Sequence, residues 1–143
     1  KKPAPFNEEE REIMKNHTIY GARLFEYSAS SMDKLASEIS ISHHENWDGS
    51  GYPGKNNNEQ TMKHHSNTIS GEAIPLSGRI VRITDVYDAL ISKRCYKDPW
   101  KEQDVIDEIQ KNSGIEFDPV LVDYFFEIYD TIKAIHSKYK ENE

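Results

Sequence analysis

The chain has 143 residues, of which 36% are hydrophobic and 30% are charged, a mixture typical of one globular domain with a single core. Its 25 Asp and Glu residues outnumber 18 Lys and Arg residues, and the net charge of -7 argues against a protein that binds polymeric nucleic acid through a basic face. No apolar run is long enough for a membrane span, and the one cysteine, Cys95, excludes an internal disulfide framework. We therefore expect one domain over residues 1–143, in the reducing cytoplasm and without membrane contact.

The first part of the chain predicts two helices. Asn7 is a good N-cap, and three glutamates follow it in what would be the first turn. Apolar residues then recur at helical spacing over 13–25, with His17 among them. The second helix is expected from about 32 to 47, and the glycine-rich turn 48–54 ends it.

The rest of the chain predicts one loop and three helices. Residues 55–70 contain almost no apolar side chains and are expected to form an exposed loop insertion. Apolar residues cover most of the circumference over 77–92, which predicts a central, largely buried helix. Two more helices are expected over 101–113 and from 119 to about 136. The predicted fold class is therefore an all-α bundle of about five helices.

Asp85 is the unusual residue of the predicted central helix, because it lies one turn from the apolar residues Val81 and Ala89. An ionised carboxylate in a buried position costs several kcal/mol unless it meets a cation or a metal ion. From spacing alone, a structural ion pair with an arginine and a role as metal ligand are equally good interpretations.

Three histidines strengthen the metal interpretation. His43 and His44 are adjacent near the end of the second predicted helix, where both can reach one ion, and His17 lies on another helix. A lone histidine on an apolar face is more often a hydrogen-bonded core residue, but three of them with Asp85 favour a site for Fe, Mn, Zn or Ni. His64 and its neighbour lie in an Asn-rich stretch, where a solvated loop is the better interpretation.

Two cations follow the predicted central helix, Arg94 and Lys97. Basic residues at a helix C-terminus are stabilised by the helix dipole without any functional role. Near a metal site, however, such cations are what a phosphate-ester substrate needs.

Residues 43–53, with the sequence HHENWDGSGYP, resemble the HHExxDGxGYP signature of HD-GYP domains. Further blocks of the family pattern follow in order along nearly the whole chain, which makes the resemblance far more specific than one short motif. These blocks are 10–17 (EREIMKNH), 74–76 (IPL), 79–80 (RI), 85–90 (DVYDAL), 94–97 and 114–119 (GIEFDP).

HD-GYP domains are all-helical members of the HD phosphohydrolase superfamily, and the resemblance implies an HD-like fold for this chain. It also implies hydrolysis of the bacterial second messenger cyclic di-GMP, to pGpG or GMP, at a site with two or three divalent metal ions. Fe or Mn are the ions we expect. The matching metal-ligand positions are His17, His43, His44 and Asp85, and we expect no further catalytic residue.

The same resemblance implies that Tyr52, Arg94 and Lys97 contact the substrate. In this family the GYP loop is also associated with GGDEF-domain proteins, so a GGDEF partner is expected there. The alternative function is a catalytically inactive module that binds cyclic di-GMP or the GGDEF partner.

The chain departs from the family pattern in two places. The His-Asp pair that gives the family its name belongs before Lys1, so we expect an upstream segment of the parent protein to supply it. Without that pair this chain alone is expected to bind metal weakly. The connection that contains 55–70 is also longer than usual, which is compatible with a lid, a partner-binding loop or a neutral insertion.

Overall fold

The computed structural model of the protein describes residues 6–54, 68–93 and 98–140. Over these ranges the chain is helical and contains no β-strand, so the all-α prediction is confirmed. No helix in the same ranges is long and apolar enough to cross a membrane. Most of the predicted insertion, together with Arg94 and Lys97, lies outside the described residues. The elements are α1 (Glu8–Lys15), α2 (His17–Arg23), α3 (Ser31–Ser42), the 3-10 helix η1 (Gly71–Ala73), α4 (Leu76–Ile91), α5 (Glu102–Lys111), α6 (Pro119–Glu127) and α7 (Tyr129–Lys140).

Five predicted helices become seven because the first and the last are each interrupted. Asn7 caps α1 as predicted, in a capping box with Glu10. At the end of α1, the carbonyl oxygens of the last turn are bonded by side chains: His17 Nδ1 lies 2.6 Å from one, and the Thr18 hydroxyl donates to another over 2.9 Å. The chain therefore turns at Asn16 before α2 begins.

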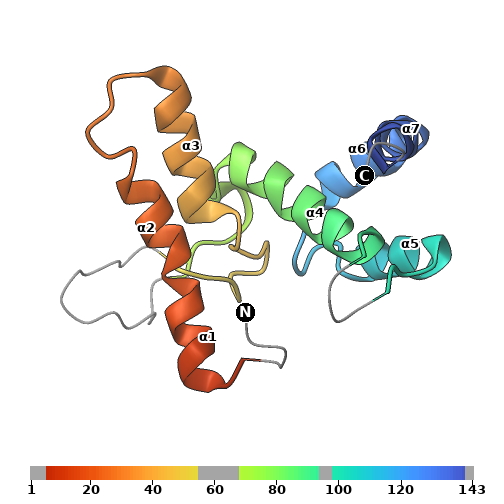
Figure 1. The fold of residues 1–143 in the computed structure, drawn as a ribbon, viewed down its shortest axis with the longest axis horizontal. Coiled ribbons are helices and arrows are strands. Elements are labelled where there is room, and N and C mark those ends of the chain that lie inside the picture. The colour runs from red at the N-terminus through yellow and green to blue at the C-terminus, as the bar shows by residue number, and fades with distance from the viewer. Residues whose placement is uncertain (1–5, 55–67, 94–97, 141–143) are drawn as a thin grey trace.

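The helix α2 packs against α3 (Figure 1), and small residues lie at this contact. Thr18 is completely buried, and a Cβ atom added to Gly21 would lie 3.2 Å from Ser40. The next crossing is closer still, because a Cβ atom on Gly78 of α4 would lie 2.1 Å from the Ser42 hydroxyl at the end of α3. Small residues thus bring the end of α3 against the start of α4.

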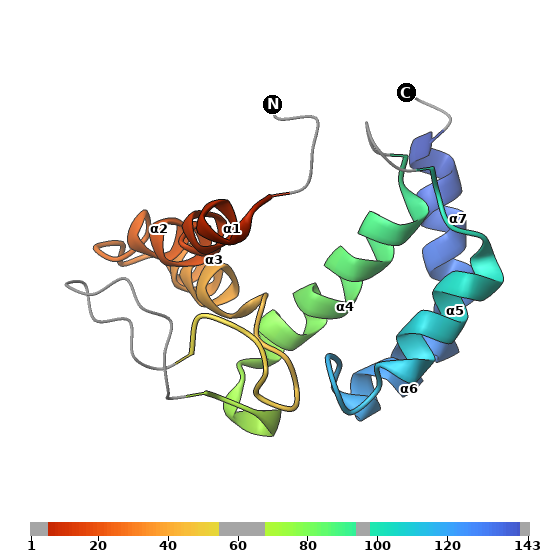
Figure 2. The ribbon, with the colours of Figure 1, turned by 90° about the horizontal axis from the view of Figure 1, so that it is seen from below.

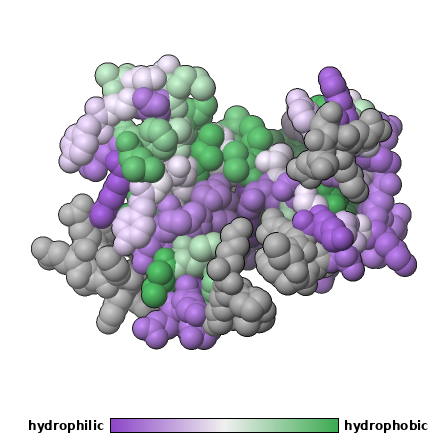
Figure 3. Space-filling model, in the orientation of Figure 1, coloured by the Kyte–Doolittle hydropathy of each residue, from purple (hydrophilic) through white to green (hydrophobic). Residues whose placement is uncertain are grey.

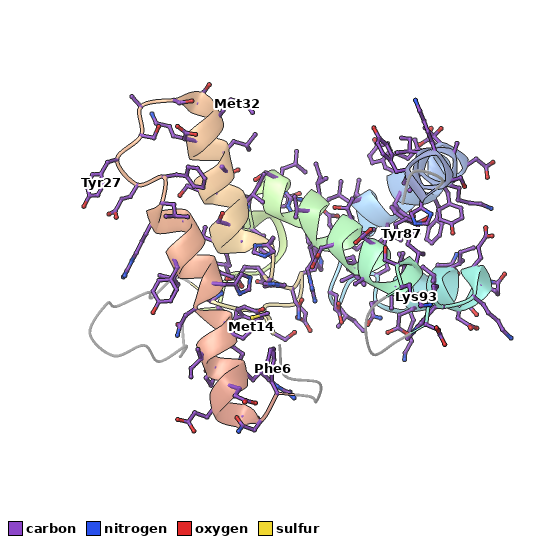
Figure 4. All side chains as sticks on the ribbon, viewed as in Figure 1. Phe6, Met14, Tyr27, Met32, Tyr87 and Lys93 are labelled. Atoms are coloured by element: carbon purple, nitrogen blue, oxygen red, sulfur yellow. The ribbon has the colours of Figure 1, made fainter. Side chains whose placement is uncertain are left out.

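The helix α4 runs from α3 to the group formed by α5, α6 and α7 (Figure 2). The helix contributes three residues, Ile83, Tyr87 and Leu90, to the buried apolar cluster on this side. Tyr87 packs edge-to-face on Phe125 with 5.3 Å between ring centroids, and Figure 4 shows it on the side of α4 that faces α6 and α7. The buried apolar cluster consists of Ile83, Tyr87, Leu90, Val105, Ile109, Phe117, Val122 and Phe125.

The prediction that α4 is buried around most of its circumference is wrong for the described residues. Its buried face includes Ile83 and Tyr87, whereas Asp85 is exposed and Ile80 is 43% exposed. Residues two apart on a helix point about 200° apart, so Asp85 lies opposite the two buried side chains. The expected burial of this carboxylate is therefore corrected.

The apolar face predicted for 13–25 is also exposed. Tyr20 of α2 is 50% exposed and its C-cap Leu24 is 82% exposed, because α2 meets α3 through its small residues and leaves its large ones outside. Tyr27, in the connection between α2 and α3, and Met32, in the first turn of α3, project outward (Figure 4). Figure 3 shows apolar surface over α3 and the first turns of α4, where Leu76 is 54% exposed.

Two arginines of α4 join it to the turn before α6. Arg79 forms an ion pair with Asp118, whose side chain is almost completely buried, and Arg82 forms a second pair with Glu116. Asp118 also caps α6 by accepting from the Val120 N–H over 2.9 Å. The Asp118 carboxylate thus both forms a tertiary ion pair with α4 and caps the N-terminus of α6.

We predict that Asp118→Ala lowers the free energy of unfolding by about 3 kcal/mol, because it removes the anionic partner of the half-buried Arg79 charge and the cap of α6. Chemical denaturation followed by circular dichroism measures this change. Lys133→Ala is the matched control, because Lys133 pairs with Glu102 where both side chains are exposed, and it should cost much less. Equal losses in the two variants would contradict the prediction.

Candidate metal centre

Three imidazoles converge between α1, α2 and the end of α3. His17 is the first residue of α2, His43 is the C-cap of α3, and His44 follows it. One nitrogen from each ring lies within 4.8 Å of the other two, so the three can hold one metal ion. The structure therefore brings together the three histidines that the sequence singled out.

The hydrogen bonds of two rings fix which nitrogen is available. His17 Nδ1 lies 2.6 Å from the Met14 carbonyl oxygen, and His43 Nδ1 lies 3.0 Å from the carbonyl oxygens of Ile39 and Ser40. Because a carbonyl oxygen only accepts, Nδ1 carries the proton in both neutral rings and Nε2 carries a lone pair. Metal-binding histidines are commonly oriented in this way.

The two Nε2 atoms of His17 and His43 face each other across 3.3 Å. Two lone pairs at this separation repel unless a proton or a cation lies between them. Ligand bonds of about 2.0–2.1 Å at a tetrahedral angle place two nitrogens roughly 3.3 Å apart. The observed spacing therefore fits a divalent metal ion.

His44 is held in the neutral form that metal binding requires. Burial, followed by the neighbouring His43 and the Arg82 guanidinium, lowers the pKa of His44 to about 3. A positive charge on this ring would be poorly solvated and would repel the other cations nearby.

The loop after the histidines folds back onto them. The Tyr52 N–H donates to the His44 carbonyl oxygen over 3.1 Å, and the Tyr52 ring stacks on the His44 ring with 4.8 Å between centroids. The backbone approach requires Gly51, because a Cβ atom there would lie 2.2 Å from the Asn46 nitrogen. Burial raises the pKa of Tyr52 to about 12, so its phenol stays protonated.

Asp85 is not one of the residues whose ligand atoms meet in this cluster. Its carboxylate is nevertheless close enough to add to the raised pKa of Tyr52, after burial as the main cause. Its role as a metal ligand remains a prediction. Arg94 and Lys97 lie outside the described residues.

Sequence reasoning missed Arg82 at this site. Its guanidinium donates to Asn46 over 3.2 Å and to Glu116 over 2.8 Å. Its charge helps to lower the pKa of His44, and it offsets part of the rise that burial causes in the pKa of Tyr52. The available signal was its position one helical turn before Asp85.

Backbone hydrogen bonds join the loop after the histidines to the turn before α6. The backbone N–H groups of Trp47 and Asp48 donate to the carbonyl oxygens of Glu116 and Ile115 over 3.2 and 2.9 Å. The Gly71 N–H donates to the Trp47 carbonyl oxygen over 2.8 Å. Two separate segments, the turn before α6 and the start of η1, therefore set the position of the loop that follows the histidines.

Several curated proteins are similar to this chain. A 3'3'-cGAMP-specific phosphodiesterase of Vibrio cholerae is 39% identical over 136 residues, which are 95% of this chain and 24% of that protein. A cyclic di-GMP phosphodiesterase of Vibrio cholerae is 37% identical and one of Thermotoga maritima is 35% identical, over 98% and 99% of this chain and 27% and 35% of theirs. The chain thus spans about a quarter to a third of the length of these relatives.

The family model for the HD domain matches residues 1–121, which include all three histidines and the loop that folds back on them. The match extends over α1 to α5, the part of the structure that builds the cluster. Together with the HHExxDGxGYP pattern of 43–53, these findings show that the chain belongs to the HD domain family and is an HD-GYP member of it.

Proposed function

We propose that this chain forms part of a metal-dependent phosphodiesterase that hydrolyses cyclic di-GMP, to pGpG or GMP, in bacterial signalling. The observation that carries the proposal is the pair of Nε2 atoms that face each other across 3.3 Å between His17 and His43. The relatives named as cyclic di-GMP and cGAMP phosphodiesterases support a cyclic dinucleotide as the substrate class.

The proposed metal ligands are His17, His43 and His44, with Asp85 as a further ligand from α4. Imidazole and carboxylate donors suit Fe or Mn, and the family resemblance supports two or three divalent ions. A bound divalent cation lowers the pKa of water and polarises the phosphodiester. The protein contributes ring orientation, because backbone carbonyl oxygens hold the two Nδ1 atoms.

The remaining residues are proposed to bind the dinucleotide. The Tyr52 ring offers a flat surface next to His44, and its protonated phenol can donate a hydrogen bond to a phosphate oxygen. Arg94 and Lys97 are proposed to neutralise the phosphates. A GGDEF-domain partner at the GYP loop, and an inactive module that binds without cleavage, remain the alternatives tested below.

We predict that His43→Ala weakens Mn²⁺ binding by at least about tenfold, because the ion loses one ligand of a preorganised pair. Isothermal titration calorimetry on the intact protein measures the affinity. His136→Ala is the matched control, because His136 lies on α7, away from the cluster, and its loss should leave the affinity unchanged. Equal affinities in wild type and His43→Ala would remove these residues from the metal site.

The intact protein with Mn or Fe should convert cyclic di-GMP to linear products, and His43→Ala should reduce turnover by about 100-fold or more. Product analysis by chromatography measures this, with 3'3'-cGAMP as a second substrate. Turnover of 3'3'-cGAMP alone would replace the proposed substrate. Binding of cyclic di-GMP without cleavage would favour the inactive module, and a GGDEF protein added to that sample then tests for the partner.

The metal-free protein should lose stability as the pH falls from 6.5 towards 3. The folded state holds the pKa of His44 at about 3, against 6.5 in the unfolded chain, so the unfolded state binds more protons in this interval. Above pH 6.5 His44 is neutral in both states, so its titration no longer lowers the stability. Urea denaturation across the interval measures the slope, and His44→Asn, which cannot titrate, should show a shallower one. Parallel slopes would be inconsistent with a depressed pKa.

A further inference from the structure

Glu45 is a buried acidic residue that the proposed chemistry does not use. It follows His44 directly and is only 3% exposed. Its Oε1 atom accepts from the Gly54 N–H over 2.6 Å, whereas its Oε2 atom is buried and has no hydrogen-bond partner among the residues that the structure describes. Burial raises the pKa of this carboxyl group. Burying a carboxyl group costs free energy, and its bond to the Gly54 N–H is the contact that offsets part of this cost.

This contact is the second of two hydrogen bonds that hold the GYP loop, and we call the two bonds together the clamp. On one side of the turn, the Tyr52 N–H is bonded to the His44 carbonyl oxygen over 3.1 Å. On the other side, the Gly54 N–H is bonded to the Glu45 side chain. Both anchors belong to the segment that carries the histidines, and together they hold the intervening turn at its two ends.

The clamp sets the position of one side chain, the Tyr52 ring. This ring is stacked on His44 at an interplanar angle of 25°. The backbone at Gly51 is already in contact with Asn46 and Glu45, so the loop cannot move inward. If the Glu45 bond is lost, the Tyr52 bond is the one of these two that remains, and the backbone at Gly54 can move away from Glu45.

We propose that Glu45 is a positioning residue that keeps the Tyr52 ring stacked on His44 by holding the Gly54 N–H. It acts as a hydrogen-bond acceptor, and its negative charge is not required. The inference deepens the proposed function, because Tyr52 is the residue through which Glu45 would affect substrate binding.

The test uses Glu45→Ala, Glu45→Gln, Tyr52→Ala and the double variant in the intact protein. Glu45→Ala should raise KM for cyclic di-GMP about tenfold with kcat much less affected, because it releases a substrate contact. Glu45→Gln keeps the acceptor and should stay within about twofold of wild type. In the Tyr52→Ala background, Glu45→Ala should add less than about twofold, because the ring on which it acts is gone. Full additivity, or a Gln variant as impaired as the Ala variant, would overturn the proposal.

A second readout does not depend on activity. The Gly54 amide should exchange with solvent at least about tenfold faster in Glu45→Ala than in wild type, as measured by NMR, and Glu45→Gln should preserve its protection. Glu127→Ala, an exposed change on α6, is the control. Unchanged Gly54 exchange in a folded Glu45→Ala protein would overturn the clamp. If the wild-type protein hydrolyses no cyclic dinucleotide, the proposed function fails, while the exchange data still decide the role of Glu45.

Discussion

The candidate site depends on two imidazoles that each donate an Nδ1 proton to a carbonyl oxygen of the preceding helical turn. In His17 that carbonyl belongs to Met14, at the end of α1, and in His43 to the last turn of α3. These bonds fix the ring orientation before any ion arrives, and they leave two lone pairs opposed. The interruption between α1 and α2 is part of the same arrangement, because the side chains that bond to the end of α1 include the His17 ring itself.

The cluster is built by elements that are far apart in the sequence. Small residues at the crossing of α3 and α4, Gly78 and Ser42, bring α4 close to the histidines. Arg82 then reaches across to Asn46 and Glu116. A positive charge beside the histidine cluster has two effects. It favours neutral imidazole, and it would attract the phosphates of the proposed substrate.

Much of the fold could be predicted from the sequence, and its errors have physical reasons. The apolar periodicity located the α-helices of the described residues, but it could not reveal that the His17 and Thr18 side chains would bond to the carbonyl oxygens of Met14 and Lys15 and interrupt the first one. The three histidines were identified because His43 and His44 are adjacent near a helix end, where both can reach one ion, and His17 lies among apolar residues on another helix. The exposure of Asp85 could not be read from apolar neighbours, since it depends on which face of α4 is covered. Glu45 was not singled out because its partner, the Gly54 N–H, is a backbone group brought near by the turn.

The backbone bonds between the loop and the turn before α6 limit how small a functional fragment of this protein can be. A peptide that stops at the end of α5 would contain all three histidines but would lack the carbonyl oxygens of Ile115 and Glu116. The amides of Trp47 and Asp48 would then be solvated, and the loop after the histidines would lose its backbone hydrogen bonds to the turn before α6. A minimal mimic of the histidine cluster therefore has to extend beyond His44 by 74 residues, to the cap of α6 at Asp118.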